Sequence, residues 1–293
     1  MAEMKDRFVR FDWAIKRLLR QKANFGVLEG FLTVFLGEKV TIVDILESES
    51  NQQDEFDKFN RVDIKARNSK GEIIIVEVQN TSEVFYLERI LYGVAKAITE
   101  HISPGDDYGE VKKVYSISVL YFDLGEGDDY LYKGQTSFFG IHTNDELKIT
   151  TRQRDAIVRK APEEIFPTYY LIRVNNFDRV AVSPMEEWMR YLKKGEISAD
   201  AKAPGLQEAR EKLLYYQMDP AERHAYDEHL NAVMIQNDVL GNARAEGLAE
   251  GRAEGRAEGR AEVAKTMMEK GMDVKIIASL TGLSEEEIKS FSK

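Results

Sequence analysis

The sequence has no cysteine and only four histidines among its 293 residues. The absence of cysteine excludes a disulfide framework and a thiolate metal site, and so few histidines argue against a histidine-rich metal centre. No apolar run approaches the roughly 20 residues that a membrane-spanning helix needs. The first residues, MAEMKDRFVRFDW, lack the apolar segment of a secretory signal. We therefore expect a cytoplasmic protein.

Basic residues are in deficit over the whole chain, with 41 Lys and Arg against 51 Asp and Glu and a formal net charge of −10. This balance excludes a histone-like polycation, but it leaves room for a local nucleic-acid site, because attraction depends on where the charges lie. The segment from Lys5 to Lys22 is such a place, since it has seven Lys or Arg and two Asp. Apolar residues from Phe8 to Leu19 recur there at helical spacing, so we predict a basic helix.

The chain divides into four regions that differ in composition and in hydrophobic pattern. Residues 1–200 predict a mixed α/β domain, and residues 205–242 are polar and helical, with a helix start at Pro220. Residues 243–262 are a low-complexity repeat, and residues 263–293 predict a small helical tail. A hydrophobic content of 43% allows a large core and excludes a wholly disordered chain.

Helix and strand patterns are interleaved in the first region. We predict strands at Thr41–Leu46, Val62–Ala66, Glu72–Gln79 and Val111–Phe122, a polar excursion over 47–60, and a helix from Tyr86 to His101. This order predicts an α/β fold in which a mixed sheet is flanked by helices, followed by an all-helical C-terminal region. The helix that begins at Tyr86 is expected to cover one face of the sheet.

The stretch from Asp63 to Gln79 predicts a β-hairpin. Asn68-Ser-Lys-Gly71 is a good turn sequence, and a three-residue loop would place Gly71 in the left-handed conformation. Asn68 then faces Glu72, so paired positions sum to 140 and Asp63 lies opposite Glu77. Because side chains alternate along a strand, Gln79 shares the face of Glu77.

Two carboxylates that face each other in this way repel, since their Cβ atoms lie about 4.5–5.5 Å apart. The neighbouring run Ile73–Val76 predicts a strand that is buried on both faces, and burial strengthens the repulsion. A divalent cation would relieve it, and oxygen ligands favour Mg²⁺ or Mn²⁺ over zinc. The alternative is a hairpin with exposed acids, one of them paired with Lys65 or Arg61. A register slip of one residue would separate the two acids and abolish the site.

Motifs along nearly the whole chain carry a family resemblance. In chain order they are Phe11-Asp12-x3-Lys16, Asp63, Glu77-Val78-Gln79, Arg89-x2-Tyr92, the Gly-Leu-Ala-Glu-Gly repeats and Gly282-Leu283-Ser284-x2-Glu287-Ile288. The acids on a hairpin ahead of a helix resemble the PD-(D/E)xK nuclease core, and the combined order resembles the recombination-promoting nuclease (Rpn) family of nucleases and transposases. The resemblance implies a restriction-endonuclease-like fold and metal-dependent DNA endonuclease activity linked to recombination.

The resemblance also implies roles for individual residues. Asp63 and Glu77 would bind Mg²⁺ or Mn²⁺, with the Val78 carbonyl as a third ligand and Asp12 as a further carboxylate that binds directly or through water. Gln79 stands where the wider superfamily often has lysine, and an amide can only form hydrogen bonds, whereas an ammonium also stabilises negative charge. Lys65 shares this face by register and is a candidate replacement.

Four further residues are candidate DNA contacts: Lys16, Arg89, Tyr92 and Lys96. Lys16 has the alternative of an ordinary ion pair with Asp12, one turn away. Arg89 has the alternative of a structural pair with a carboxylate, and Tyr92 that of simple packing.

From Ala245 the chain reads AEGL AEGR AEGR AEGR AE, a period of four residues. In a helix all of its i,i+4 charge pairs are alike and every fourth residue is glycine, so an isolated helix would be weak. One interpretation is a flexible linker. The other is that two copies of the chain pair, with an Arg stripe against a Glu stripe.

The tail has helix-turn-helix spacing at Ala278, Gly282 and Ile288, with Asp273 as one N-cap and Ser284 with Glu287 as a capping box. Its second helix would begin with two glutamates, which DNA repels. We therefore favour a protein-interaction or oligomerisation bundle over a DNA reader.

Two functions follow. The first is a Mg²⁺-dependent DNA endonuclease, a hydrolase of phosphodiester bonds associated with recombination or transposition, that forms a homo-oligomer through its C-terminal helical region. The second is a catalytically weak or inactive DNA-binding, oligomeric scaffold with the same fold. Neither involves a membrane.

Overall fold

The computed structural model of the chain describes residues 7–46, 62–153 and 156–291. It forms two units, residues 1–226 and 227–293, which are taken in turn. No helix in these described ranges is long and apolar enough to cross a membrane. The predicted excursion over 47–60 lies outside the described residues, and the predicted division at residues 200, 242 and 262 stays a prediction.

The described residues of the first unit form a six-stranded sheet, a separate two-stranded hairpin and five α-helices that lie wholly within the unit. The helices are α1 (Phe11–Arg17), α2 (Phe25–Leu36), α3 (Tyr86–Thr99), α4 (Pro184–Lys194) and α5 (Leu206–Lys212). The strands are β1 (Ile42–Leu46), β2 (Ile64–Asn68), β3 (Ile73–Gln79), β4 (Val114–Leu120), β5 (Leu131–Gly134), β6 (Ile149–Gln153), β7 (Ala156–Lys160) and β8 (Thr168–Arg173).

The main sheet is mixed, with strand order β1-β2-β3-β4-β8-β5. Its three central strands, β3, β4 and β8, are parallel. Strands β2 and β5 join them antiparallel, and β1 pairs antiparallel with β2. Six of the seven residues of β3 are buried, as the run Ile73–Val76 predicts for a central strand. The predicted mixed sheet with flanking helices is confirmed. The hairpin β6–β7 is separate from this sheet and was not predicted.

The hairpin register is the one that the turn sequence predicts. Ile64 faces Val76 and Arg67 faces Ile73, so every pair sums to 140. The Asn68 amide donates to the Glu72 carbonyl at 3.1 Å, and Gly71 has φ +78°. Glycine adopts this left-handed conformation without the steric penalty of a Cβ atom. The loop therefore sets which residues of β2 and β3 share a face.

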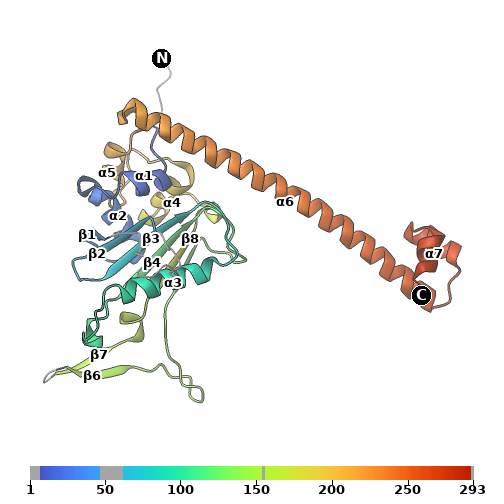
Figure 1. Cartoon of the computed structure of the whole chain (residues 1–293), viewed down its shortest axis with the longest axis horizontal. Coiled ribbons are helices and arrows are strands. Elements are labelled where there is room, and N and C mark those ends of the chain that lie inside the picture. The colour runs from blue at the N-terminus through green and yellow to red at the C-terminus, as the bar shows by residue number, and fades with distance from the viewer. Residues whose placement is uncertain (1–6, 47–61, 154–155, 292–293) are drawn as a thin grey trace. The chain divides into compact units, whose positions relative to one another are not determined.

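Helices cover both faces of the sheet (Figure 1). On one face, Ile73 and Ile75 of β3 pack against Val94 and Ala97 of α3. Because side chains alternate, Glu77 lies on this same face. On the other side α1, α2, α4 and α5 gather around an aromatic core. The core contains Phe11, Phe31, Trp188 and Tyr191, with ring centroids 4.9–6.3 Å apart.

The predicted helix Phe8–Leu19 is wrong at both ends, since α1 begins at Phe11 and ends at Arg17. Before Phe11 the chain is extended and pairs with a distant segment: the Val9 amide donates to the Leu213 carbonyl at 2.7 Å. This pairing satisfies the backbone hydrogen bonds that a helix would otherwise satisfy. The partner is about 200 residues away, so local spacing cannot reveal it.

The second unit follows a helix start that was predicted correctly. Helix α6 (Pro220–Glu269) begins in the first unit at Pro220 and continues through the repeats into the second. The Asp219 carboxylate accepts from the Glu222 amide at 2.9 Å and so caps the helix. The repeats are therefore helical in the structure.

The tail forms a small three-helix core. Helices α7 (Val274–Thr281) and α8 (Glu285–Ser290) pack on the end of α6, where Ala264, Ile277 and Ile288 are buried together. Both predicted caps are confirmed: Asp273 accepts from the Lys275 amide, and Ser284 and Glu287 form a capping box.

Candidate active site

A cavity of about 620 Å³ opens where β3 ends and β2 begins. Its lining comes from α1 and the turn after it, the hairpin and α3: Lys16, Arg17, Arg20, Val62, Asp63, Glu77, Val78, Gln79 and Arg89. The lining contains four basic residues and two acids, a formal charge of +2 in a chain of −10. The structure therefore brings together Asp63, Glu77 and Gln79, as the hairpin register predicts. Beside them lie Lys16, Arg17 and Arg20, which we call the basic wall.

Asp63 is held against β3 by a backbone contact. It lies at a bend just before β2, and its Oδ2 accepts a hydrogen bond from the Val78 amide at 2.7 Å. In the register of the hairpin the Val78 amide would donate to the carbonyl of residue 62 if β2 began two residues earlier. The Asp63 carboxylate takes the place of that carbonyl. The N–H and C=O of one strand residue point to the same side, so the Val78 carbonyl also lies on the Asp63 side of β3.

Both carboxyl groups are held in a poorly solvated place. Glu77 is 5% exposed, and burial raises its pKa to about 7 despite the opposing effect of Arg89, while Asp63 adds to the rise. Burial also raises the pKa of Asp63, opposed by Lys16, whose Nζ lies 3.7 Å from Oδ1. Each acid therefore resists ionisation unless a positive charge is near.

Glu83 contacts two residues of the cavity lining, Gln79 and Arg89, and was not predicted from the sequence. Arg89 donates to Glu77 through Nη2 and to Glu83 through Nη1, so it bridges two acids. The same Glu83 oxygen accepts from Gln79 Nε2 at 2.8 Å. Glu83 lies in the short loop between β3 and α3. An acid between two polar site residues in so short a loop was the available signal.

Asp12 is not among the residues that line the cavity. It is fully buried, and it accepts from Arg10 Nε at 3.1 Å and from Asn80 Nδ2 at 3.2 Å. Asn80 directly follows Gln79, the last residue of β3, so the contact with Asp12 holds the end of this strand. A direct role for Asp12 at a metal is therefore not favoured by this arrangement.

Three other candidate residues also lie outside the cavity lining. Tyr92 and Lys96 are on α3 with Arg89, at exposed and half-buried positions, and both make contacts within the protein. Lys65 shares the face of Asp63 by register, but its Nζ is paired with Glu100 at 2.7 Å. In the structure Lys65 therefore does not replace the missing superfamily lysine.

The donor atoms fit a hard divalent cation. Two carboxylates and a backbone carbonyl are oxygen ligands, and Mg²⁺ is commonly held by one or two carboxylates with water and phosphate in its remaining positions. Within the described ranges no cluster of three or more His, Cys, Asp or Glu forms a metal site supplied by side chains alone. The residues present therefore suit an ion that is shared with a phosphate substrate.

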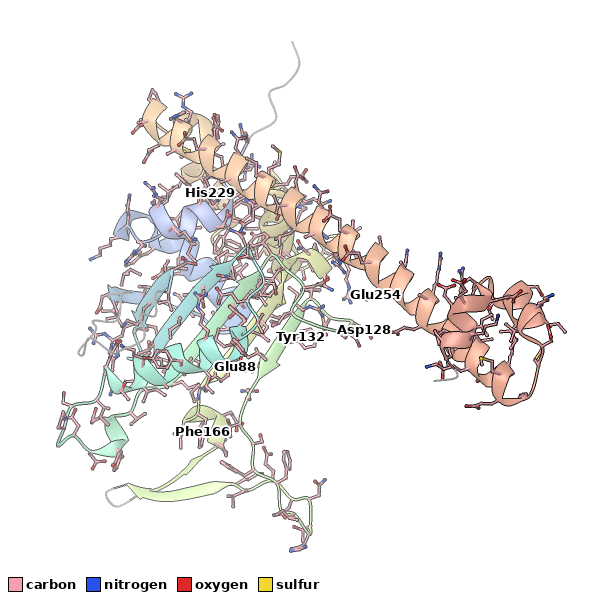
Figure 2. All side chains as sticks on the ribbon, turned by 45° about the vertical axis from the view of Figure 1, so that its right-hand side comes forward. Glu88, Asp128, Tyr132, Phe166, His229 and Glu254 are labelled. Carbon is pink, nitrogen blue, oxygen red and sulfur yellow. The ribbon has the colours of Figure 1, made fainter. Side chains whose placement is uncertain are left out.

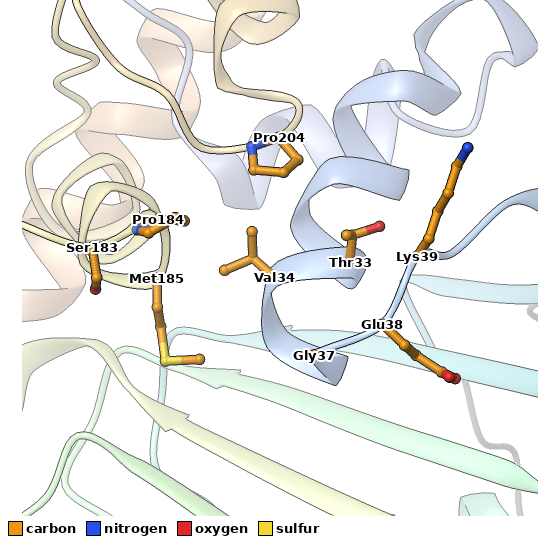
Figure 3. A pocket seen from close by; sticks show the side chains of 9 residues that line it. All are labelled: Thr33, Val34, Gly37, Glu38, Lys39, Ser183, Pro184, Met185 and Pro204. Atoms are coloured by element: carbon orange, nitrogen blue, oxygen red, sulfur yellow. The ribbon is translucent and has the colours of Figure 1, made fainter.

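A second cavity, of about 410 Å³, has no comparable chemistry (Figure 3). It lies between the end of α2 and the start of α4, lined by Thr33, Val34, Gly37, Glu38, Lys39, Ser183, Pro184, Met185 and Pro204. It contains a single carboxylate and a single ammonium group. We therefore assign the candidate site to the first cavity.

The mixed sheet with flanking helices is that of a PD-(D/E)XK restriction-endonuclease-like fold. Residues 9–150 match the family model described as PD-(D/E)XK nuclease family transposase, and residues 257–293 match the Rpn/YhgA-like nuclease family, C-terminal HTH domain. The chain belongs to the Rpn family of PD-(D/E)XK nuclease-transposases. Searches of curated proteins and of solved structures returned no significant match.

The second match bears on the tail. It identifies residues 257–293 as a helix-turn-helix domain, which supports DNA binding by this part of the chain. Our preference for a protein-interaction bundle over a DNA reader receives no support from it.

Proposed function

We propose that this chain is a Mg²⁺- or Mn²⁺-dependent DNA endonuclease that hydrolyses phosphodiester bonds during recombination or transposition. The observation that carries the proposal is the convergence of two poorly solvated carboxyl groups, Asp63 and Glu77, on an open cavity with a basic wall. The family match to nuclease-transposases supports the same reaction class.

The basic wall suits a polyanionic substrate. Lys16, Arg17 and Arg20 lie on the α1 side of the cavity, where they would contact phosphates. Arg89 also lines the cavity, and an entering phosphate would compete with two acids for its guanidinium. Tyr92 and Lys96 would extend the contact surface along α3, and the helix-turn-helix tail would add a second point of attachment to DNA.

The proposed roles of the hairpin residues follow from their atoms. Asp63, Glu77 and the Val78 carbonyl would hold the ion. A bound divalent ion neutralises charge on the phosphate and lowers the pKa of water. The Gln79 amide nitrogen donates one hydrogen bond to Glu83, and the amide oxygen would accept a hydrogen bond from the attacking water. Other members of the superfamily often have a lysine at the position of Gln79. In this chain the basic wall would supply the positive charge of that lysine.

The test is cleavage of plasmid and linear DNA in the presence of Mg²⁺ or Mn²⁺. We expect Asp63→Ala and Glu77→Ala each to lose at least about a hundredfold in rate, because an ion held by two carboxylates loses half of its side-chain ligands. Glu110→Ala is a matched control, since Glu110 is an exposed acid paired with Lys112. Unchanged activity in both site variants would rule out the assignment.

A DNA-binding scaffold without efficient chemistry is the alternative. The observation that favours it is Gln79, which lacks the positive charge of a lysine and which uses one of its two amide N–H donors in the contact with Glu83. This alternative predicts DNA binding that weakens with salt, without metal-dependent nicking. The same cleavage assay separates the two functions. In both we propose a homo-oligomer that forms through the C-terminal helices.

A further inference from the structure

Aromatic and basic residues alternate along one side of α3. The set is Phe85, Arg89, Tyr92 and Lys96, and we call it the aromatic–basic stripe. At 100° per residue these four positions fall within about 60° of one another around the helix axis. Phe85 stands at the N-cap position, and its carbonyl accepts from the Arg89 amide at 3.0 Å, so it belongs to the first turn.

The stripe is distinct from the side of α3 that packs on the sheet. The buried residues of that side are Tyr86, Ile90, Val94 and Ala97. In contrast, Phe85 is 70% exposed and Tyr92 is 37% exposed. Glu88, the one acid among residues 86–99, lies outside the stripe (Figure 2). Packing of α3 on the sheet therefore does not account for the two rings.

The stripe begins at the candidate active site. Arg89 lines the cavity and donates to Glu77 and Glu83. Phe85 follows Glu83 by two residues and lies one turn before Arg89 on the same side of α3. The proposed nuclease must admit DNA to this cavity, so a strand that reaches Arg89 also comes within reach of Phe85.

Rings that alternate with cations suit unpaired nucleotides. A base can stack on an aromatic side chain when its face is uncovered, whereas neighbouring pairs cover the base faces inside a duplex. Phosphates of a duplex can be bound by basic residues alone. Phe85 and Tyr92 are seven residues apart, as are Arg89 and Lys96, which corresponds to about 10 Å along the helix axis. That length matches about three nucleotides of a stacked strand at 3.4 Å each.

We propose, resting on the nuclease function above, that the aromatic–basic stripe binds unpaired DNA nucleotides beside the bond that is cut. Phe85 stacks on a base, and Arg89 contacts the phosphate that enters the cavity. Tyr92 and Lys96 continue the stacking and the phosphate contacts along α3. The cavity then prefers single-stranded DNA, or an unpaired segment within a duplex, to fully paired DNA, and Phe85 is a residue that determines this specificity.

Binding of a labelled oligothymidine to the full-length chain tests the stacking by fluorescence anisotropy. The strand has about twelve nucleotides, within the site sizes of single-strand-binding modules, and a chelator prevents metal-dependent cutting. We expect Phe85→Leu to weaken binding at least about fivefold and Phe85→Trp to retain it, because leucine lacks an aromatic face and tryptophan has a larger one. Leu87→Ala is the matched control, since Leu87 is 54% exposed on nearly the opposite side of α3.

Two further ligands separate stacking from other roles of Phe85. A strand of the same length without bases, and a fully paired duplex, should each bind the natural and Phe85→Leu chains within about twofold of each other. An equal loss on these ligands would overturn the proposal, because Phe85 would then act through the fold or through phosphates. Oligothymidine binding that is undetectable, or unchanged in Phe85→Leu, would overturn it too. An inactive nuclease would instead fail only the cleavage assay, so the two failures are distinguishable.

Discussion

The side chain of Gln79 donates a hydrogen bond from Nε2 to Glu83 Oε1 at 2.8 Å. The same oxygen accepts from Arg89, which also reaches Glu77. Because a carboxylate can only accept from the amide nitrogen, this contact determines which end of the Gln79 amide is used and leaves the oxygen as a free acceptor. A lysine at this place would be a donor with a positive charge. The contact therefore changes what the position can do.

Removal of Glu83 should impair the proposed chemistry without unfolding the protein. We expect Glu83→Ala to lower the single-turnover cleavage rate about tenfold, because Gln79 loses its orientation, while DNA affinity changes little. The Glu83 side chain is 38% exposed, so the midpoint of thermal unfolding should hardly move. Glu88→Ala, an exposed acid on α3, is the control. A cleavage rate equal to that of the natural chain would show that Glu83 has no positioning role.

Glu77 should make the stability of the metal-free protein depend on pH. Its pKa is about 7 in the folded chain, against 4.5 for an unperturbed glutamate. Between these values the folded state binds more protons than the unfolded state, so the free energy of unfolding falls as pH rises from about 4.5 to 7 and then levels off.

Glu77→Gln should remove most of this dependence and stabilise the protein at pH 8 by on the order of 2–3 kcal/mol. The measurement is urea unfolding at pH 5, 6, 7 and 8 with a chelator present, with Glu88→Gln as the control. If the natural chain and the Glu77 variant show the same pH profile, the carboxyl group is not desolvated as described.

The hairpin loop should be sensitive at one residue. Gly71→Ala introduces a Cβ atom at φ +78° and should lower the free energy of unfolding by about 1–2 kcal/mol, although the new atom meets nothing within 4 Å. Lys70→Ala in the same loop should change it by no more than about 1 kcal/mol, since its pair with Glu38 is exposed. An equal effect of both changes would contradict the loop geometry.

The turn sequence and the alternation of side chains were sufficient to predict that Asp63, Glu77 and Gln79 lie together. Gly71 after Asn68 determines the loop, the loop determines the register, and the alternation of side chains then places Asp63, Glu77 and Gln79 on one face. Each step uses residues close in sequence. The mixed sheet and the position of α3 on one of its faces followed from the order of helix and strand patterns, whereas the strand order did not.

Other features depended on contacts that local patterns do not encode. Phe8 was assigned to a helix because its spacing fits one, but this segment pairs with residues near Leu213. Asp12 matches a family motif, yet its partners Arg10 and Asn80 are known only once α1 lies beside the end of β3. Glu83 stands between two predicted site residues in the sequence, but its contacts with Gln79 and Arg89 are known only from the structure.

The basic wall should contribute to DNA affinity. Lys16→Ala and Arg20→Ala should each weaken DNA binding about three- to tenfold at moderate salt and lower the slope of log affinity against log salt by about 1. Lys22→Ala is the matched control, because it belongs to the same basic segment but does not line the cavity. A salt slope that stays the same in both wall variants would exclude these residues as phosphate contacts.

The most direct test of the central claim is calorimetric titration of Mn²⁺ into the full-length chain at pH 7.5. If Asp63 and Glu77 share an ion, Asp63→Asn and Glu77→Gln should each weaken binding at least about tenfold. Asp44→Asn, which alters an acid paired with Arg67 outside the cavity, should leave it unchanged. Mn²⁺ binding of natural affinity in both site variants would contradict the claim that these two carboxylates hold the metal.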